Sequence, residues 1–221
     1  GRWKYSYEGR KGIEMNGVLV LANGVKFYGT LLGDVEGFGE LVFNTGMTGY
    51  QECFTDPSYE GQILTLTYPL IGNYGANDDF MQNAYPVAAG YVVDQITERP
   101  SNWECKEQIS DFIQRYRVPC LYNVDTRAVT RELRRHGVMK GVIVRADRTE
   151  EEIKQLLNKS MYTDQIARVT TKKTYVYGQG KYKVALVDCG LKKSILEMLV
   201  ANDCQVHVFP AFTKAEELLA I

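Results

Sequence analysis

The sequence lacks the features that define several large classes of protein. No apolar run approaches the roughly 18 residues that a membrane-spanning helix needs, and no charged and then apolar leader opens the chain. The 26 basic and 27 acidic side chains give a formal net charge of −1, which provides no overall field to attract nucleic acid or an anionic membrane. We therefore expect a cytoplasmic protein that binds neither nucleic acid nor a membrane, unless an organelle transit peptide has been removed.

Cysteine is present but not in a pattern that builds a site. The five cysteines are widely spaced and include no CxxC pair, which argues against a zinc site. Their odd number and wide spacing also argue against a disulfide framework. We therefore expect no metal and mostly buried, reduced thiols at Cys53, Cys105, Cys120, Cys189 and Cys204.

The rest of the composition is typical of a globular protein with one large or two small domains. The chain has 221 residues, of which 45% are apolar and 24% charged. Two short β-type runs flank Asn23-Gly24, a strong hairpin signal because both residues tolerate positive φ. Further strands are predicted at residues 39–44, 62–68, 88–93, 120–124 and 141–146.

Three helices are predicted among these strands. Ser101 with Glu104 has the form of a capping box and is expected to open the first helix. Asp125 is expected to cap the second helix, at residues 126–136. Thr149 with Glu152 repeats the capping box for the third, which runs to about residue 158. Strands that come first and then alternate with helices predict an α/β domain with mixed sheets.

The predicted domain boundaries follow from changes in character along the chain. Residues 1–14 show no clear periodicity, and we interpret them as a tag or extension. Residues 15–165 form the predicted N-terminal domain. Residues 166–182 are basic, contain glycine and have no long apolar face, so we interpret them as a linker. Residues 183–221 form the beginning of a second domain.

The second domain has the pattern of a βαβ unit. A strand at residues 183–188 is followed by a helix at 191–202, with Leu191, Ile195 and Leu199 on one side, and by a strand at 204–210. Thr213 with Glu216 is expected to open another helix. Two parallel strands cannot bury both faces of a sheet, so we expect this domain to be truncated.

Few residues carry recognisable chemistry by themselves. Cys189 follows a strand, at the end where open α/β sheets usually bind ligands, and His207 on the next strand could serve it as a base. A packed cysteine and a hydrogen-bonded histidine are the more common outcome. The glycines near residues 46–75 match neither GxGxxG nor a Walker A loop, so phosphate binding by them is not favoured.

A family resemblance adds to this reading. Residues 43–75, FNTGMTGYQECFTDPSYEGQILTLTYPLIGNYG, closely resemble the signature of the small, glutamine-handling subunit of carbamoyl-phosphate synthetase. The segments LVLANGVKFYG, VDTRAVTRELRRHGVMKGVI and KVALVDCGLKKSILEMLV are similar to the same family in the same order. The resemblance implies an α/β fold in which an N-terminal β/β/α domain precedes the first βαβ unit of a class I glutamine amidotransferase domain.

The resemblance also implies a function and one site residue. In the family, the serine of the TDPSY motif contributes to the glutamine site, and here it is Ser58. Asp56-Pro57 is a turn-forming pair, so we expect Ser58 on an exposed turn. The implied function is to supply ammonia from L-glutamine to a large subunit that makes carbamoyl phosphate with ATP and Mg, for arginine or pyrimidine synthesis. The family's catalytic Cys and His segments have no match in this chain, so we expect no catalytic residue, cofactor or metal here and no activity of the chain alone.

Two alternatives stay open at this stage. The chain could be a catalytically silent docking module that uses the same N-terminal domain only for binding. It could also be an unrelated thiol enzyme that uses Cys189 and His207.

Overall fold

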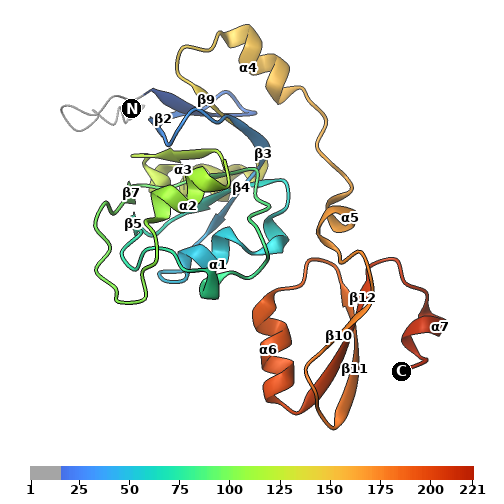
Figure 1. Ribbon diagram of the computed structural model, residues 1–221. Helices are drawn as coiled ribbons and strands as arrows, with labels where there is room; N and C mark the ends of the chain where they lie inside the picture. The colour runs from blue at the N-terminus through green and yellow to red at the C-terminus, as the bar shows by residue number, and fades with distance from the viewer. Residues whose placement is uncertain (1–15) are drawn as a thin grey trace.

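The structure is a computed structural model that describes residues 16–221 (Figure 1), so the predicted tag or extension at residues 1–14 lies outside the described residues. It contains an N-terminal unit, residues 17–157, and a C-terminal unit, residues 175–218, joined by a stretch that carries α5 (Gln165–Val169). The prediction of a mixed α/β protein is confirmed.

In the described part of the N-terminal unit, strands join into one closed sheet. Its order is β1 (Gly17–Leu21), β2 (Lys26–Leu31), β8 (Cys120–Tyr122), β6 (Gly90–Val92), β4 (Gln62–Leu66), β3 (Gly37–Asn44) and β9 (Met139–Arg145), which pairs back onto β1. The neighbours β3, β4, β6 and β8 run parallel and the other pairs are antiparallel. A small parallel sheet joins β5 (Leu70–Ile71) to β7 (Gln95–Ile96). The closed sheet is therefore mixed, as the sequence predicts.

Both faces of the closed sheet are covered. In β1, Leu19 packs in the cluster that includes Val129 of α3 (Thr126–His136), whereas Val18 packs with Ile153 of α4 (Glu150–Leu157). Because side chains alternate along a strand, burial of every residue of β1 requires cover on both sides. A third cluster forms around α1 (Tyr50–Phe54) and α2 (Ile109–Arg115), with the short 3-10 turns η1 (Pro57–Tyr59) and η2 (Asp78–Phe80) nearby.

Two of the three predicted helix starts in this unit are confirmed. The Asp125 side chain accepts a hydrogen bond from the Ala128 amide at 2.8 Å and caps α3. Thr149 and Glu152 form the reciprocal capping box of α4. Each cap needs only groups three residues apart, so the local sequence suffices to predict it.

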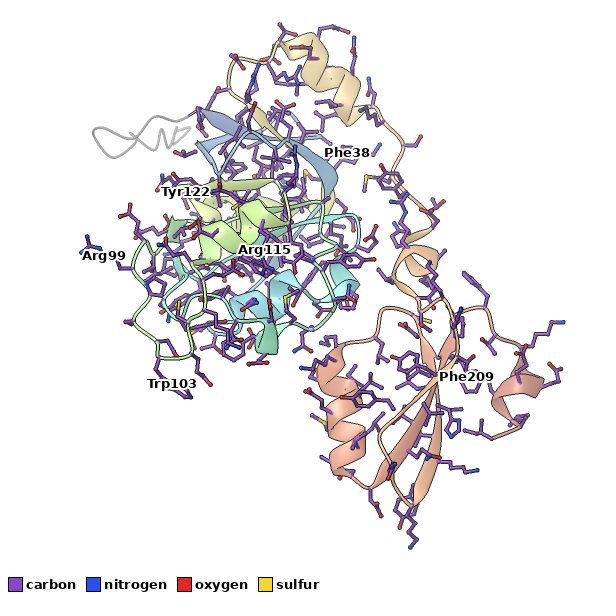
Figure 2. All side chains as sticks on the ribbon, viewed as in Figure 1. Phe38, Arg99, Trp103, Arg115, Tyr122 and Phe209 are labelled. Carbon is purple, nitrogen blue, oxygen red and sulfur yellow. The ribbon has the colours of Figure 1, made fainter. Side chains whose placement is uncertain are left out.

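The predicted start at Ser101 is wrong. Helix α2 begins at Ile109, and Asn102 instead accepts the Glu104 amide at 2.7 Å in a local turn. The following residues are extended, because Glu107 pairs with Ala76 in an antiparallel bridge. Figure 2 shows Trp103 at the outer edge of this loop, and its side chain is exposed. A long-range backbone contact therefore overrides the local helix signal.

The C-terminal unit is a sheet of order β10 (Tyr175–Tyr177), β12 (Cys204–Pro210) and β11 (Tyr182–Asp188). Strands β11 and β12 are parallel and α6 (Lys193–Ala201) connects them, which confirms the predicted βαβ unit. The predicted linker is not free of secondary structure, because α5 and β10 lie within it and β10 pairs with β12. The assignment of this unit to a class I amidotransferase domain stays a prediction.

Two details of the C-terminal unit differ from the sequence prediction. Leu196, rather than Ile195, is the buried residue of α6, and Ile195 is exposed. The last helix, α7 (Ala215–Leu218), begins after Lys214 and has no side-chain cap, so the predicted Thr213 capping box does not form. One face of the sheet packs against α6 around Val206, and Phe209 of β12 is also buried (Figure 2).

The cysteines are free thiols. Cys120 and Cys204 are buried, Cys53 and Cys105 are half-buried, and Cys189 is exposed. Complete burial raises the pKa of the Cys120 thiol to about 12, so this group stays protonated and unreactive. Among residues 16–221, no group of three or more potential ligands could hold a metal ion, and no helix is long and apolar enough to cross a membrane.

Candidate functional site

The turn that carries Ser58 is built by its neighbours. Asp56 precedes η1 and accepts a hydrogen bond from the Ser58 amide at 2.9 Å, while Pro57 occupies the first position of the turn. Proline fixes φ there and has no amide to satisfy, and an aspartate in this position caps the turn. The Ser58 residue is exposed, so the predicted exposed turn is confirmed.

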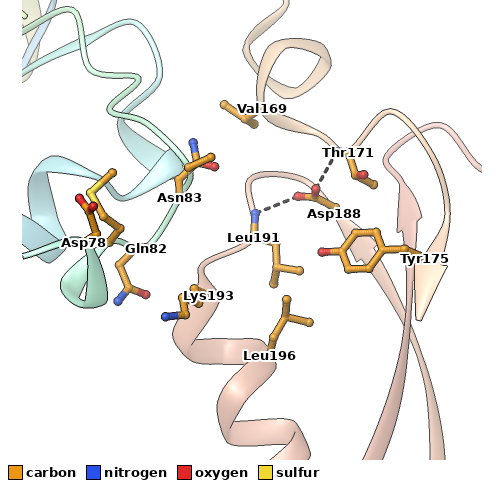
Figure 3. Close-up of a pocket in the computed structure, with 12 residues that line it drawn as sticks. Asp78, Gln82, Asn83, Val169, Thr171, Tyr175, Asp188, Leu191, Lys193 and Leu196 are labelled. Atoms are coloured by element: carbon orange, nitrogen blue, oxygen red, sulfur yellow. Dashed lines mark hydrogen bonds between the residues drawn. The ribbon is translucent and has the colours of Figure 1, made fainter. Parts of the chain in front are cut away.

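A second loop faces this turn. It starts from Asp188, the last residue of β11, whose side chain accepts hydrogen bonds from the amides of Gly190 at 2.9 Å and Leu191 at 2.8 Å. The other Asp188 oxygen accepts from the Thr171 amide at 2.7 Å (Figure 3). This buried carboxylate therefore fixes the loop from both sides.

The two loops are in close contact. Gly190 has φ of 109°, and a Cβ placed there would lie 3.6 Å from the carbonyl oxygen of Pro57 and 3.2 Å from Val169. Glycine avoids the strained backbone and the tight approach to Val169, whereas 3.6 Å from Pro57 is an ordinary van der Waals separation. The loop of residues 188–192 and the Ser58 turn thus pack directly against each other.

One ion pair connects the two units at this contact, and a second joins α5 to the N-terminal unit. Lys192 Nζ lies 3.3 Å from Asp56 Oδ2, so Asp56 holds the Ser58 amide with one oxygen and Lys192 with the other. Nearby, Arg168 approaches Glu60 at 3.6 Å. Burial raises the pKa of the Glu60 carboxyl, and the Arg168 charge opposes this shift.

A cavity of about 420 Å³ lies beside these contacts. Ser58 and Glu60 line it from the N-terminal unit, Cys189 lines it from the C-terminal unit, and Val169 and Gln165 of α5 complete part of its wall. Cavities of this size accept small molecules. The structure therefore brings the predicted residue Ser58 to a shared cavity between the units.

Cys189 and His207 do not form the pair that the thiol-enzyme alternative requires. His207 lies level with Ala185 in the parallel pairing of β11 and β12. Cys189 is four residues further along, which corresponds to roughly 13 Å of extended chain. The His207 ring nitrogen instead lies 3.2 Å from the Gln205 side-chain oxygen.

Sequence reasoning missed three residues of this site. Asp188 is the last residue of β11 and Lys192 lies just before α6, so a position at or soon after the end of a predicted strand was the available signal. Gln82, which contacts the start of α6, had no signal, because a glutamine in a turn-rich segment is unremarkable.

Comparison with known proteins gives a consistent result. Residues 19–143 match the family described as "Carbamoyl-phosphate synthase small chain, CPSase domain". The chain is 45% identical over 205 residues to the carbamoyl phosphate synthase small chain of Oceanobacillus iheyensis, covering 92% of this chain and 56% of that protein.

Two further relatives agree. A pyrimidine-specific small chain from Halalkalibacterium halodurans is 46% identical over 206 residues, covering 92% of this chain and 57% of the relative. A small chain from Clostridium perfringens is 44% identical over 209 residues, covering 94% and 60%. The chain thus spans somewhat more than half the length of these relatives.

Proposed function

Because the chain belongs to the carbamoyl-phosphate synthase small chain family, we propose that it acts as the glutamine-handling subunit of that synthase. In this role the small subunit supplies ammonia from L-glutamine to a large subunit. The large subunit would use ATP and Mg to make carbamoyl phosphate. The chain's own residues would help to bind glutamine and to dock the large subunit.

The contact between the Ser58 turn and the loop of residues 188–192 is the observation that carries this proposal. A glutamine site shared by two units needs both to present groups to one cavity, and Ser58 and Cys189 line the same 420 Å³ space. A hydroxyl both donates and accepts hydrogen bonds, so Ser58 can bind a polar amino acid as a donor or as an acceptor. We assign Ser58 a binding role and Cys189 no catalytic role.

The segment of residues 43–75 would contribute to docking of the large subunit. It exposes Met47, Tyr68 and Leu70, of which Met47 is 74% exposed. Gly72 and Gly75 have φ of 90° and 71°, values that favour glycine and shape these loops. Exposed apolar and aromatic side chains on shaped loops suit an interface that excludes water.

Substitution of Ser58→Ala tests the binding role. The assay uses a small chain of the relatives' full length that contains this sequence, paired with its large subunit. One neutral hydrogen bond is worth about 0.5–1.5 kcal/mol, so the glutamine KM should rise roughly two- to tenfold. Ammonia-dependent synthesis should not change, since it bypasses the glutamine site.

Ser101→Ala is the matched control, because Ser101 is an exposed serine of the same unit outside the cavity. It should leave both activities unchanged. Unaltered glutamine kinetics in Ser58→Ala would remove Ser58 from the site. Tight binding to the large subunit without any glutamine-dependent synthesis, even in the full-length chain, would favour the silent docking module.

A further inference from the structure

Helix α6 has no cap of its own. Its N-cap residue, Lys192, makes no side-chain capping hydrogen bond. The first amides of a helix have no partner within the helix and need one elsewhere. In α6 the Ile195 amide donates to the Lys192 carbonyl, and the Lys193 and Ser194 amides find their partner in the other unit, at Gln82.

Gln82 satisfies two of these amides. Its backbone carbonyl accepts from the Lys193 amide at 2.9 Å, and its side-chain oxygen accepts from the Ser194 amide at 3.2 Å. Figure 3 shows Gln82 on the N-terminal unit facing the start of α6, beside a second cavity of about 450 Å³. One residue of the N-terminal unit therefore caps a helix of the C-terminal unit.

Gln82 is itself held by the segment that carries the Ser58 turn. Its amide donates to the Thr55 hydroxyl at 2.9 Å, and that hydroxyl donates to the Gln51 carbonyl at 2.9 Å. Thr55 is fully buried and lies only three residues before Ser58. A continuous set of hydrogen bonds thus runs from the Ser58 segment through Gln82 to α6.

The loop of residues 188–192 leads directly into α6, so the position of α6 sets the position of the loop. From this arrangement we propose that Gln82 is a positioning residue that fixes the loop against the Ser58 turn by capping α6 across the unit boundary. It does not touch the ligand itself. The inference rests on the proposed function, because the separation between the loop of residues 188–192 and the Ser58 turn would set the width of the proposed glutamine cavity.

Three variants separate this role from general stability. Gln82→Leu removes the side-chain acceptor, Gln82→Glu keeps an acceptor oxygen at the same place, and Gln114→Leu makes the same change at an exposed glutamine of α2. The first measurement is hydrogen exchange of the Ser194 amide in this chain. Gln82→Leu should speed it by about two- to tenfold, as expected for one neutral hydrogen bond, whereas the other two should match the wild type.

The second measurement uses the full-length small chain paired with its large subunit. Gln82→Leu should raise the glutamine KM by about two- to tenfold and leave ammonia-dependent synthesis unchanged, and Gln82→Glu should restore the KM. Faster Ser194 exchange with an unchanged KM would overturn the positioning role. Equal defects in the Leu and Glu variants would also overturn it, because acceptor chemistry would then be irrelevant.

The two proposals fail in different ways. If the wild-type complex makes no carbamoyl phosphate from glutamine, the proposed function fails and the positioning role fails with it. If the wild type is active and Ser58→Ala raises the KM but Gln82→Leu does not, only the positioning role fails.

Discussion

The Thr55 hydroxyl offers the sharpest test of how the two loops are held. Thr55→Val keeps the branched shape of the side chain but removes the acceptor of the Gln82 amide. The Gln51 carbonyl keeps a partner, because it also accepts the Thr55 backbone amide at 3.0 Å. The substitution therefore leaves one partly buried donor, the Gln82 amide, without its partner.

An orphaned donor costs about 1–3 kcal/mol. For a chain of this size each kcal/mol lowers the melting temperature by about 2–4 °C, so Thr55→Val should lower it by roughly 2–12 °C. Thermal unfolding followed by circular dichroism measures this shift, and hydrogen exchange should show a faster Gln82 amide. Thr55→Ser retains the hydroxyl and should keep the slow Gln82 exchange. A Thr55→Val chain with the melting temperature of the wild type and equally slow hydrogen exchange at the Gln82 amide would refute the reasoning.

Three further predictions concern the scaffold and the chain as a whole. Gly75→Ala should destabilise the protein well beyond Gly24→Ala in urea unfolding, because both residues have positive φ but only at Gly75 would a Cβ overlap Cys105. Arg148→Met should be less stable than the wild type at pH 7. The hydrogen bond from Arg148 lowers the pKa of Glu36 from its ordinary value of 4.5. The stability difference between the wild type and Arg148→Met should therefore be fully present above pH 4.5 and shrink as the pH falls below it. The 221-residue chain alone should release no glutamate from glutamine in a coupled assay, because its exposed thiol and its strand histidine are not paired.

Local signals predicted part of the site. The Asp56-Pro57 pair predicted a turn, and the turn is there with Ser58 exposed on it. The family resemblance singled out Ser58 among the serines, which the residues alone could not do. That Ser58 binds glutamine stays a proposal.

Other features could not be predicted because their partners are distant in the chain. The extended backbone at Glu107 follows from pairing with Ala76, and β10 becomes a strand because β12 lies beside it. In each case a backbone that local patterns assign to a helix or linker makes its hydrogen bonds to a remote segment.

Elements whose stabilising groups lie within a few residues of one another could be predicted from local sequence. The Asn23-Gly24 hairpin, the Asp125 cap and the capping box of Thr149 are of this kind. Which loops meet depends on long-range packing, which places Gly190 near Pro57 and lets Gln82 cap a helix of the other unit. A short-range hydrogen bond needs little chain ordering to form, whereas a contact between distant segments forms only when burial of the surrounding apolar surface offsets the lost chain entropy.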